Sequence, residues 1–107
     1  MGEKDEARAA GDKAILLGSQ SQIHDFARGL EAQGHQDEAL ELFQSNVKKD
    51  PHTWIAHNEA ARIAVAKGDF DTALKEMKLA MAESPAALKS QHADLVRRLE
   101  NKEDINR

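Results

Sequence analysis

Apolar residues recur along most of the chain with the spacing of an amphipathic helix. In residues 21–33 they stand at positions i, i+3, i+4 and i+7, which brings them onto one helical face. Residues 37–48 and 54–66 also carry apolar residues on one helical face, as do two later stretches around Phe70–Met81 and Leu88–Leu99. Successive amphipathic helices of this kind predict an all-α fold. The first apolar face consists of Ile23, Phe26, Ala27 and Leu30.

A glycine lies between the two helices of each pair. Gly34 follows the first helix and is expected in the left-handed αL conformation, which glycine adopts without steric cost. Gly68 breaks the third helix, and Asp69 can cap the helix that follows. Each pair of helices is therefore predicted to form a hairpin closed by a short turn.

Two prolines mark the boundaries between the pairs. Pro51 ends the second helix, because the residue before a proline, here Asp50, avoids the αR conformation. Pro85 opens the fifth helix, and we expect Ser84 to be its N-cap with the proline in its first turn.

The two hairpins match each other in sequence. A shift of 34 residues superposes eight identical residues, among them a glycine, a proline and several alanines. Alanine lets helices approach closely, so we expect Ala39 and Ala73 at the tightest helix contacts. The identities pair Ala27 with Ala61, Arg28 with Arg62, Ala32 with Ala66, Gly34 with Gly68, Asp37 with Asp71, Ala39 with Ala73, Leu40 with Leu74 and Pro51 with Pro85.

A helical hairpin of this period with these fixed positions resembles the tetratricopeptide repeat (TPR). The resemblance implies a right-handed α-α superhelix of TPR-like helical hairpins, ended by a capping helix. The boundaries that we expect are an N-terminal helix or linker over residues 1–19, repeats over 20–53 and 54–85, a capping helix over 86–101 and a frayed tail over 102–107.

Both repeats depart from the family pattern. The large aromatic residue expected early in the first helix is Ile23 in one copy and His57 in the other. The tyrosine expected in the middle of that helix is Leu30 and Ala64. The resemblance therefore implies a degenerate pair of repeats that is less stable than a consensus array.

The later part of the chain also looks like the C-terminal helical region of an uncharacterised bacterial family of exported proteins. In that family such repeats follow a β-rich domain of unknown function, so the likeness implies a fragment or an engineered derivative of a larger bacterial protein. The matching runs are Trp54-Ile55-Ala56-His57, Gly68-Asp69, Ser84-Pro85, Leu99-Glu100 and Asp104-Ile105-Asn106.

In TPR proteins the first helix of each hairpin lines a concave groove, so the resemblance implies a protein-binding module. Two arginines at equivalent sites, Arg28 and Arg62, would make this groove suited to an acidic or extended peptide. Alternatively, both arginines pair with acids one turn away, such as Glu31 and Glu59, on a solvated face. Glu59 also argues against the clamp for chaperone tails known in this superfamily, because it would repel a terminal carboxylate. The partner-binding residues implied by the resemblance are His24, Arg28, Asn58, Arg62, Lys89 and His92.

Composition and charge exclude several other functions. The 107 residues contain 32% charged residues, 40% hydrophobic residues and no cysteine, and the net charge is -4. Disulfides and thiolate metal sites are thereby excluded, and the basic patch of a nucleic-acid binder is missing. We expect no membrane segment, and the charged start does not fit a signal peptide. The chain is expected to be soluble, in the cytoplasm as it stands or in the periplasm if it derives from an exported parent.

No constellation of residues predicts catalysis, a metal ion or a cofactor. The five histidines form no i, i+4 pair on a helix, and no HExxH pattern is present. Ser19 and Ser21 near His24 and Asp25 contain the residue types of a catalytic triad, but one short helical start cannot position them as one. We therefore expect a protein that is not an enzyme.

Trp54 leaves the oligomeric state open. It stands at the start of a helix, away from the usual aromatic site of the repeat, where it can fill the space between the two hairpins. Tryptophan is also enriched at interfaces, so Trp54 could instead anchor a partner or a second copy of the chain. The alternatives to peptide binding are thus a homodimer, formed for example by exchange of a terminal helix, and an accessory region of a larger protein.

Overall fold

The computed structural model of the chain describes residues 19–106, and in this part the fold is all-α. The predicted helix or linker over residues 1–19 lies, apart from Ser19, outside the described residues. The predicted boundaries of the first four helices agree with the observed ones to within one or two residues, whereas the helix predicted over residues 86–101 begins as a 3-10 helix and becomes α-helical only at Lys89. The helices are α2 (Gln20–Ala32), α3 (Gln36–Lys49), α4 (Trp54–Ala66), α5 (Phe70–Glu83), the 3-10 helix η1 (Ala86–Leu88) and α6 (Lys89–Glu100).

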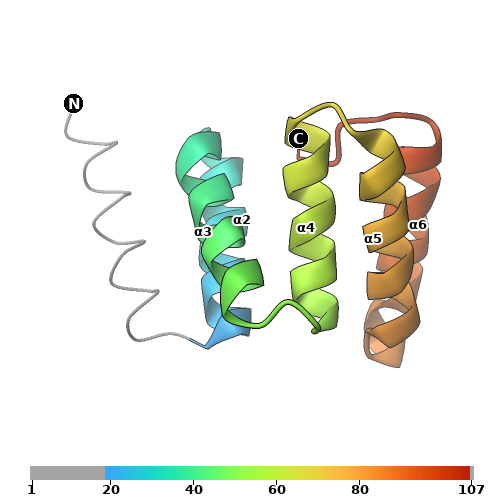
Figure 1. Cartoon of the computed structure of the whole chain (residues 1–107), viewed down its shortest axis with the longest axis horizontal. Coiled ribbons are helices and arrows are strands. Elements are labelled where there is room, and N and C mark those ends of the chain that lie inside the picture. The colour runs from blue at the N-terminus through green and yellow to red at the C-terminus, as the bar shows by residue number, and fades with distance from the viewer. Residues whose placement is uncertain (1–18, 107) are drawn as a thin grey trace.

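Helices that follow one another along the chain are also neighbours in space (Figure 1). α2 packs with α3 and α4 packs with α5, which gives the two expected hairpins. α4 also packs against α3, and α6 packs against α5. α4 is therefore the central helix, and α6 lies at the far side of the second hairpin.

One type of turn ends three helices at intervals of 34 residues. Gly34 and Gly68 adopt positive φ angles of 88° and 77°, as the sequence predicted for Gly34. The turn after α6 has the same form, but Lys102 occupies its αL position with φ 55°. In each turn the next backbone N–H donates to a carbonyl five residues earlier, from His35 to Leu30, from Asp69 to Ala64 and from Glu103 to Arg98.

The third turn changes the interpretation of α6. Because it recurs with the same spacing and the same hydrogen bond, α6 is equivalent in the sequence period to α2 and α4 rather than a helix outside the repeat. The 34-residue period could have indicated this turn, but a lysine at its centre gives no turn signal by itself.

The caps of the later helices were predicted in part. Asp69 caps α5 as expected, and its carboxylate accepts from the backbone N–H of Thr72 at 3.1 Å. The expected role of Ser84 as an N-cap is wrong. Ser84 is the residue that ends α5, and its hydroxyl donates to the carbonyl of Met81 at 3.2 Å. The chain then passes through η1 before α6 begins at Lys89.

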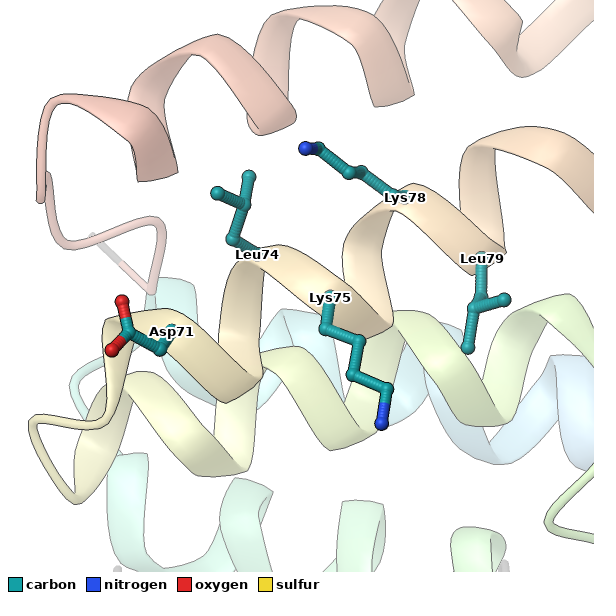
Figure 2. A pocket seen from close by; sticks show the side chains of 5 residues that line it. All are labelled: Asp71, Leu74, Lys75, Lys78 and Leu79. Atoms are coloured by element: carbon teal, nitrogen blue, oxygen red, sulfur yellow. The ribbon is translucent and has the colours of Figure 1, made fainter.

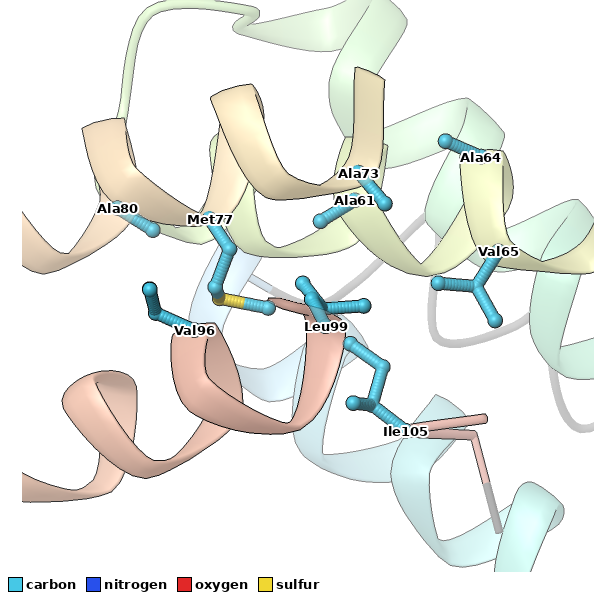
Figure 3. Close-up of a cluster of buried hydrophobic side chains, with 9 residues drawn as sticks. All are labelled: Ala61, Ala64, Val65, Ala73, Met77, Ala80, Val96, Leu99 and Ile105. Atoms are coloured by element: carbon cyan, nitrogen blue, oxygen red, sulfur yellow. The ribbon is translucent and has the colours of Figure 1, made fainter. Parts of the chain in front are cut away.

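The apolar core is divided into two clusters. The first lies within the first hairpin, around Phe43. The second joins α4, α5 and α6 (Figure 3). Ala39 and Ala73 are fully buried in the first and second cluster, in agreement with the prediction of close helix contacts. The second cluster consists of Ala61, Ala64, Val65, Ala73, Met77, Ala80, Val96, Leu99 and Ile105.

The expectation of a frayed tail over residues 102–107 is wrong for the described residues. Ile105 is only 2% exposed and belongs to the second apolar cluster, and Asn106 is buried as well. After the turn at Lys102 the chain runs back from α6 toward the end of α4, as Figure 1 shows. A single isoleucine among polar residues gives no helical periodicity, so the sequence pattern did not reveal this segment.

Candidate functional site

A pocket of about 380 Å³ lies between α2, α4 and α6. Its walls come from three helices that occupy equivalent places in the 34-residue period. Five of the six groove residues predicted from the sequence line this pocket, together with Trp54. The lining residues are His24, Asp25, Arg28, Trp54, Asn58, Arg62, Leu88, Gln91, His92, Asp94 and Leu95.

Three of the lining residues stand at the same site of successive units. His24, Asn58 and His92 are separated by 34 residues each and come from α2, α4 and α6. Asn58 and His92 are buried, whereas His24 is partly exposed. The repeat thus places a polar side chain with ring or amide nitrogens on each of the three walls.

A one-way series of hydrogen bonds fixes the middle of the pocket. Arg62 Nε donates to Asn58 Oδ1 at 2.7 Å, so the amide nitrogen of Asn58 points the other way, toward His92 Nε2 at 3.2 Å. The other ring nitrogen of His92, Nδ1, lies 2.9 Å from the carbonyl oxygen of Leu88. A carbonyl only accepts, so Nδ1 carries the hydrogen and Nε2 accepts from Asn58. The geometry therefore assigns the ring orientation of His92, with Nδ1 as donor and Nε2 as acceptor.

Arg62 is almost completely buried, with an exposed fraction of 4%. Burial, assisted by the nearby charge of Arg28, lowers the pKa of Arg62 to about 10. Glu31 and Glu59 act in the opposite direction, and the guanidinium still carries its charge at neutral pH. Besides Asn58 it holds the carbonyl of Ile105, which accepts from Nη1 at 3.0 Å.

The two arginines of the predicted groove differ in their surroundings. Arg28 forms the ion pair with Glu31 that one of the two sequence interpretations expected, and its side chain remains 41% exposed. Arg62 is not paired with Glu59 on a solvated face, because both side chains are buried and Arg62 donates to Asn58 instead. Only Arg28 is therefore accessible to a ligand without rearrangement of the interior.

Glu59 joins the first hairpin to α4. Its Oε2 lies 3.0 Å from His24 Nδ1 and accepts from Asn46 Nδ2, also at 3.0 Å. The side chain is 0% exposed, and burial raises the pKa of the carboxyl above its ordinary value, although the hydrogen bonds from His24 and Asn46 oppose this. Gln20 extends the network, since its side chain donates to the backbone carbonyls of Asn46 and Asp50.

Lys89, the sixth residue predicted for the groove, lies elsewhere. Its Nζ donates to the carbonyls of Met81 and Ala82 at 2.8 and 3.0 Å. It thus satisfies carbonyls at the end of α5, where a cation is favourable. Because η1 precedes α6, Lys89 is the first residue of that helix and does not line the pocket.

Trp54 packs against α6, which lies outside the two hairpins whose interface the sequence predicted it to fill. Its ring meets the His92 ring edge-on, with centroids 5.4 Å apart and planes at 88°. Because Trp54 is partly exposed and lines the pocket, its indole also forms part of the surface that a ligand would meet.

A second hollow lies on the outer side of α5. Leu74 and Lys78 project from one side of the helix and Lys75 and Leu79 from the other (Figure 2). Leu79 is 38% exposed, the one large apolar side chain with such exposure among the described residues. A single helix forms this hollow, so polar groups from different elements do not converge on it.

Residues 19–106 form neither a cluster of metal-binding side chains nor a membrane-spanning helix. No three histidine, aspartate or glutamate side chains in this part come together to hold a metal ion. None of its helices combines the length and apolar character required to cross a bilayer. Among the described residues, the pocket between α2, α4 and α6 is a place where polar side chains of three helices converge.

Comparisons with known proteins add no assignment. A scan against protein-family models, a search of curated proteins and a search of solved structures each give no match to this chain.

Proposed function

We propose that the chain is a protein-interaction module of TPR type that binds an extended peptide segment of another protein between α2, α4 and α6. The observation that carries this proposal is the convergence of three helices, equivalent in a 34-residue period, on one polar pocket. In this proposal the stack is a short right-handed superhelix, and α6 is the first helix of an incomplete third unit.

The pocket suits binding better than catalysis. The described residues that line it include no hydroxyl, thiol or lysine side chain, so a nucleophile could come only from a carboxylate or a histidine. Asn58 and His92 are engaged with each other and with the protein interior, and Arg62 holds them in place. Fixed polar groups of this kind lower the entropic cost of binding, because they are already oriented.

The charges of the pocket indicate the type of ligand. Arg28 offers an exposed guanidinium at one wall, while Asp25 and Asp94 supply negative charge nearby. An extended peptide with an acidic side chain directed at Arg28 would fit this distribution. The side chains of Trp54 and Gln91, which also line the pocket, would offer hydrogen-bond donors to its main chain.

A library of displayed peptides, selected for binding to the full chain, tests this function. Arg28→Glu should weaken binding of the selected peptides by about 10- to 100-fold, since a charge-assisted hydrogen bond contributes ~1.5–3 kcal/mol. Arg62→Glu is unsuitable because it would bury an unpaired charge. Lys75→Glu, on the outer side of α5, is the matched control and should leave affinity unchanged. Equal peptide affinities of the unsubstituted chain, Arg28→Glu and Lys75→Glu would contradict the proposed site.

Self-association is a second candidate function, which the exposed Leu79 on α5 favours. Light scattering on a size-exclusion column over a tenfold range of concentration distinguishes the two. A monomer throughout supports the peptide groove. A dimer that Leu79→Lys dissociates, and that Arg28→Glu leaves intact, would instead make the chain an assembly element.

A further inference from the structure

The segment Glu103–Asn106 lies against one end of the groove, and its last two residues, Ile105 and Asn106, form a turn. Arg62 holds it from both its side chain and its main chain. Its Nη1 donates to the carbonyl of Ile105 at 3.0 Å, and its own carbonyl accepts from Asn106 Nδ2 at 2.9 Å. Arg98, on α6, donates to the carbonyl of Asp104 at 3.1 Å.

Two kinds of contact hold this segment. The arginines recognise backbone carbonyls at Asp104 and Ile105, which every peptide offers. The side chains of Ile105 and Asn106 add selectivity. Ile105 belongs to the apolar cluster and lies beside Leu99 (Figure 3). The side-chain amide nitrogen of Asn106 donates to the backbone carbonyl of Arg62 in α4.

The site that this segment occupies, here called its seat, contains buried acceptor atoms whose hydrogen bonds are not completed by the chain's own residues. Among the described residues, the buried atoms Asn106 Oδ1 and Glu31 Oε2 have no hydrogen-bond partner. Both residues border a cavity of about 460 Å³ that Arg28 and Gln36 also line. The only bond from Gln36 to this segment is a long one, 3.5 Å to the carbonyl of Asn106. Unmet buried acceptors weaken a contact, so a separate peptide can compete with the segment for this site.

The turn that directs the segment into its seat is also unfavourable. Lys102 has φ 55°, and it is the one residue other than glycine with positive φ in residues 19–106. The two equivalent turns use Gly34 and Gly68, for which this conformation costs little. The backbone conformation of Lys102 therefore destabilises the bound position of the segment.

We infer that the seat of Glu103–Asn106 is a recognition site for a partner peptide, which the chain's own segment occupies until the partner displaces it. The partner would present a short segment with a branched aliphatic residue followed by a side-chain amide, as in Ile105-Asn106. This inference rests on the proposed peptide-binding function and specifies its partner. Arg62 contacts the segment and also lines the groove, so the two sites are continuous.

The experiment uses the full chain, a synthetic peptide of the sequence KEDINR and a control peptide KEDDNR. Ile105→Asp should release the chain's own segment and leave the seat open. In that variant KEDINR should shift the backbone amide NMR signals of α4 around Arg62 at millimolar concentration, and KEDDNR should bind about tenfold more weakly. In the unsubstituted chain KEDINR should bind about tenfold more weakly than in the variant, because the tethered segment competes.

A second variant keeps the test decisive if Ile105→Asp does not fold. Lys102→Gly relieves the turn, so it should hold the segment more firmly and reduce the binding of KEDINR further, by about threefold. Equal binding of both peptides, or equal binding to all variants, would overturn the inference. So would hydrogen exchange of the Asn106 amide at the rate of a free peptide.

The outcomes separate this inference from the proposed function. The selected library peptides could depend on Arg28 but lack the aliphatic–amide pair and bind equally with and without Ile105→Asp. This result would support the groove function and overturn the inference. A lack of any peptide binding, with the segment seated or released, would overturn both.

Discussion

Asn58 and His92 lie 34 residues apart in the sequence, and the amide of the first donates to the ring of the second at 3.2 Å in the protein interior. The contact joins equivalent sites of two successive units. Arg62 makes it possible, because its Nε occupies the amide oxygen of Asn58 and so directs the amide nitrogen toward the ring.

The removal of this amide should therefore be costly. Asn58→Ala leaves Arg62 Nε and His92 Nε2 without partners in the interior, and we expect a loss of about 2–3 kcal/mol in the free energy of unfolding. Urea unfolding measures this loss. Asn101→Ala is the control, since Asn101 is exposed and should change stability by less than about 0.5 kcal/mol. Similar stabilities of the two variants would contradict the hydrogen-bond assignment.

The buried carboxyl of Glu59 should make stability depend on pH in a defined direction. Its folded-state pKa is raised, so the folded protein binds more protons than the unfolded chain above pH 4.5. The contribution of this group is fully present at lower pH and is lost as the pH rises through the folded pKa. Glu59→Gln does not titrate, so it should gain stability relative to the unsubstituted chain between pH 4 and pH 7.

Urea unfolding at several pH values measures this difference. Asp69 serves as a comparison of opposite sign, because hydrogen bonds from Thr72 lower the pKa of its carboxyl. The stabilising effect of Asp69 is therefore lost as the pH falls, and Asp69→Asn should lose stability at neutral pH. A Glu59→Gln variant whose relative stability falls toward pH 7 would show that attraction to His24 outweighs burial.

The two matched alanines give a test of helix packing. Ala39→Leu and Ala73→Leu should each destabilise the protein by ~1–3 kcal/mol, because both sites are fully enclosed and cannot accept three more carbon atoms. Ala32→Leu and Ala66→Leu form the control pair, since they are also matched in the repeat but are exposed at the ends of α2 and α4. Thermal melting that does not separate the two pairs would refute this account of the contacts.

The turn glycines should be sensitive to substitution for a backbone reason alone. An added Cβ meets no atom within 4 Å at Gly34, Gly68 or Gly29. At Gly34 and Gly68 the positive φ makes alanine unfavourable by about 1 kcal/mol. Gly29 lies inside α2, so Gly29→Ala should instead stabilise by about 0.5–1 kcal/mol. Melting temperatures that move in the same direction for all three variants would contradict this assignment.

The sequence predicted the parts of the fold that depend on local rules. Helical spacing, the glycine turns and the cap at Asp69 each act over a few residues, and the structure agrees with them. The sequence did not predict the role of Ser84, because a Ser-Pro pair fits both the end of one helix and the start of the next. The local pattern could not distinguish between these two uses.

The positions that line the pocket were predicted better than the burial and contacts of their side chains. The repeat and the family resemblance placed five of six residues at the pocket, because the period determines which positions share a wall. They could not show that Arg62 is buried or that Lys89 binds the end of α5. These features depend on η1 and on the segment after Lys102, whose contacts connect residues more than 40 positions apart.

The division of the apolar core into two clusters has a consequence for folding. α4 contributes to both, with Ile63 packed on the first and Ala61 buried in the second. Between the hairpins the buried contacts of Glu59 are polar, and such contacts can be exchanged for water at lower cost than an apolar core. We expect the first hairpin and the α4–α6 unit to behave as separate cooperative units in native-state hydrogen exchange. The pocket spans both units, so its width should follow the opening of the less stable one.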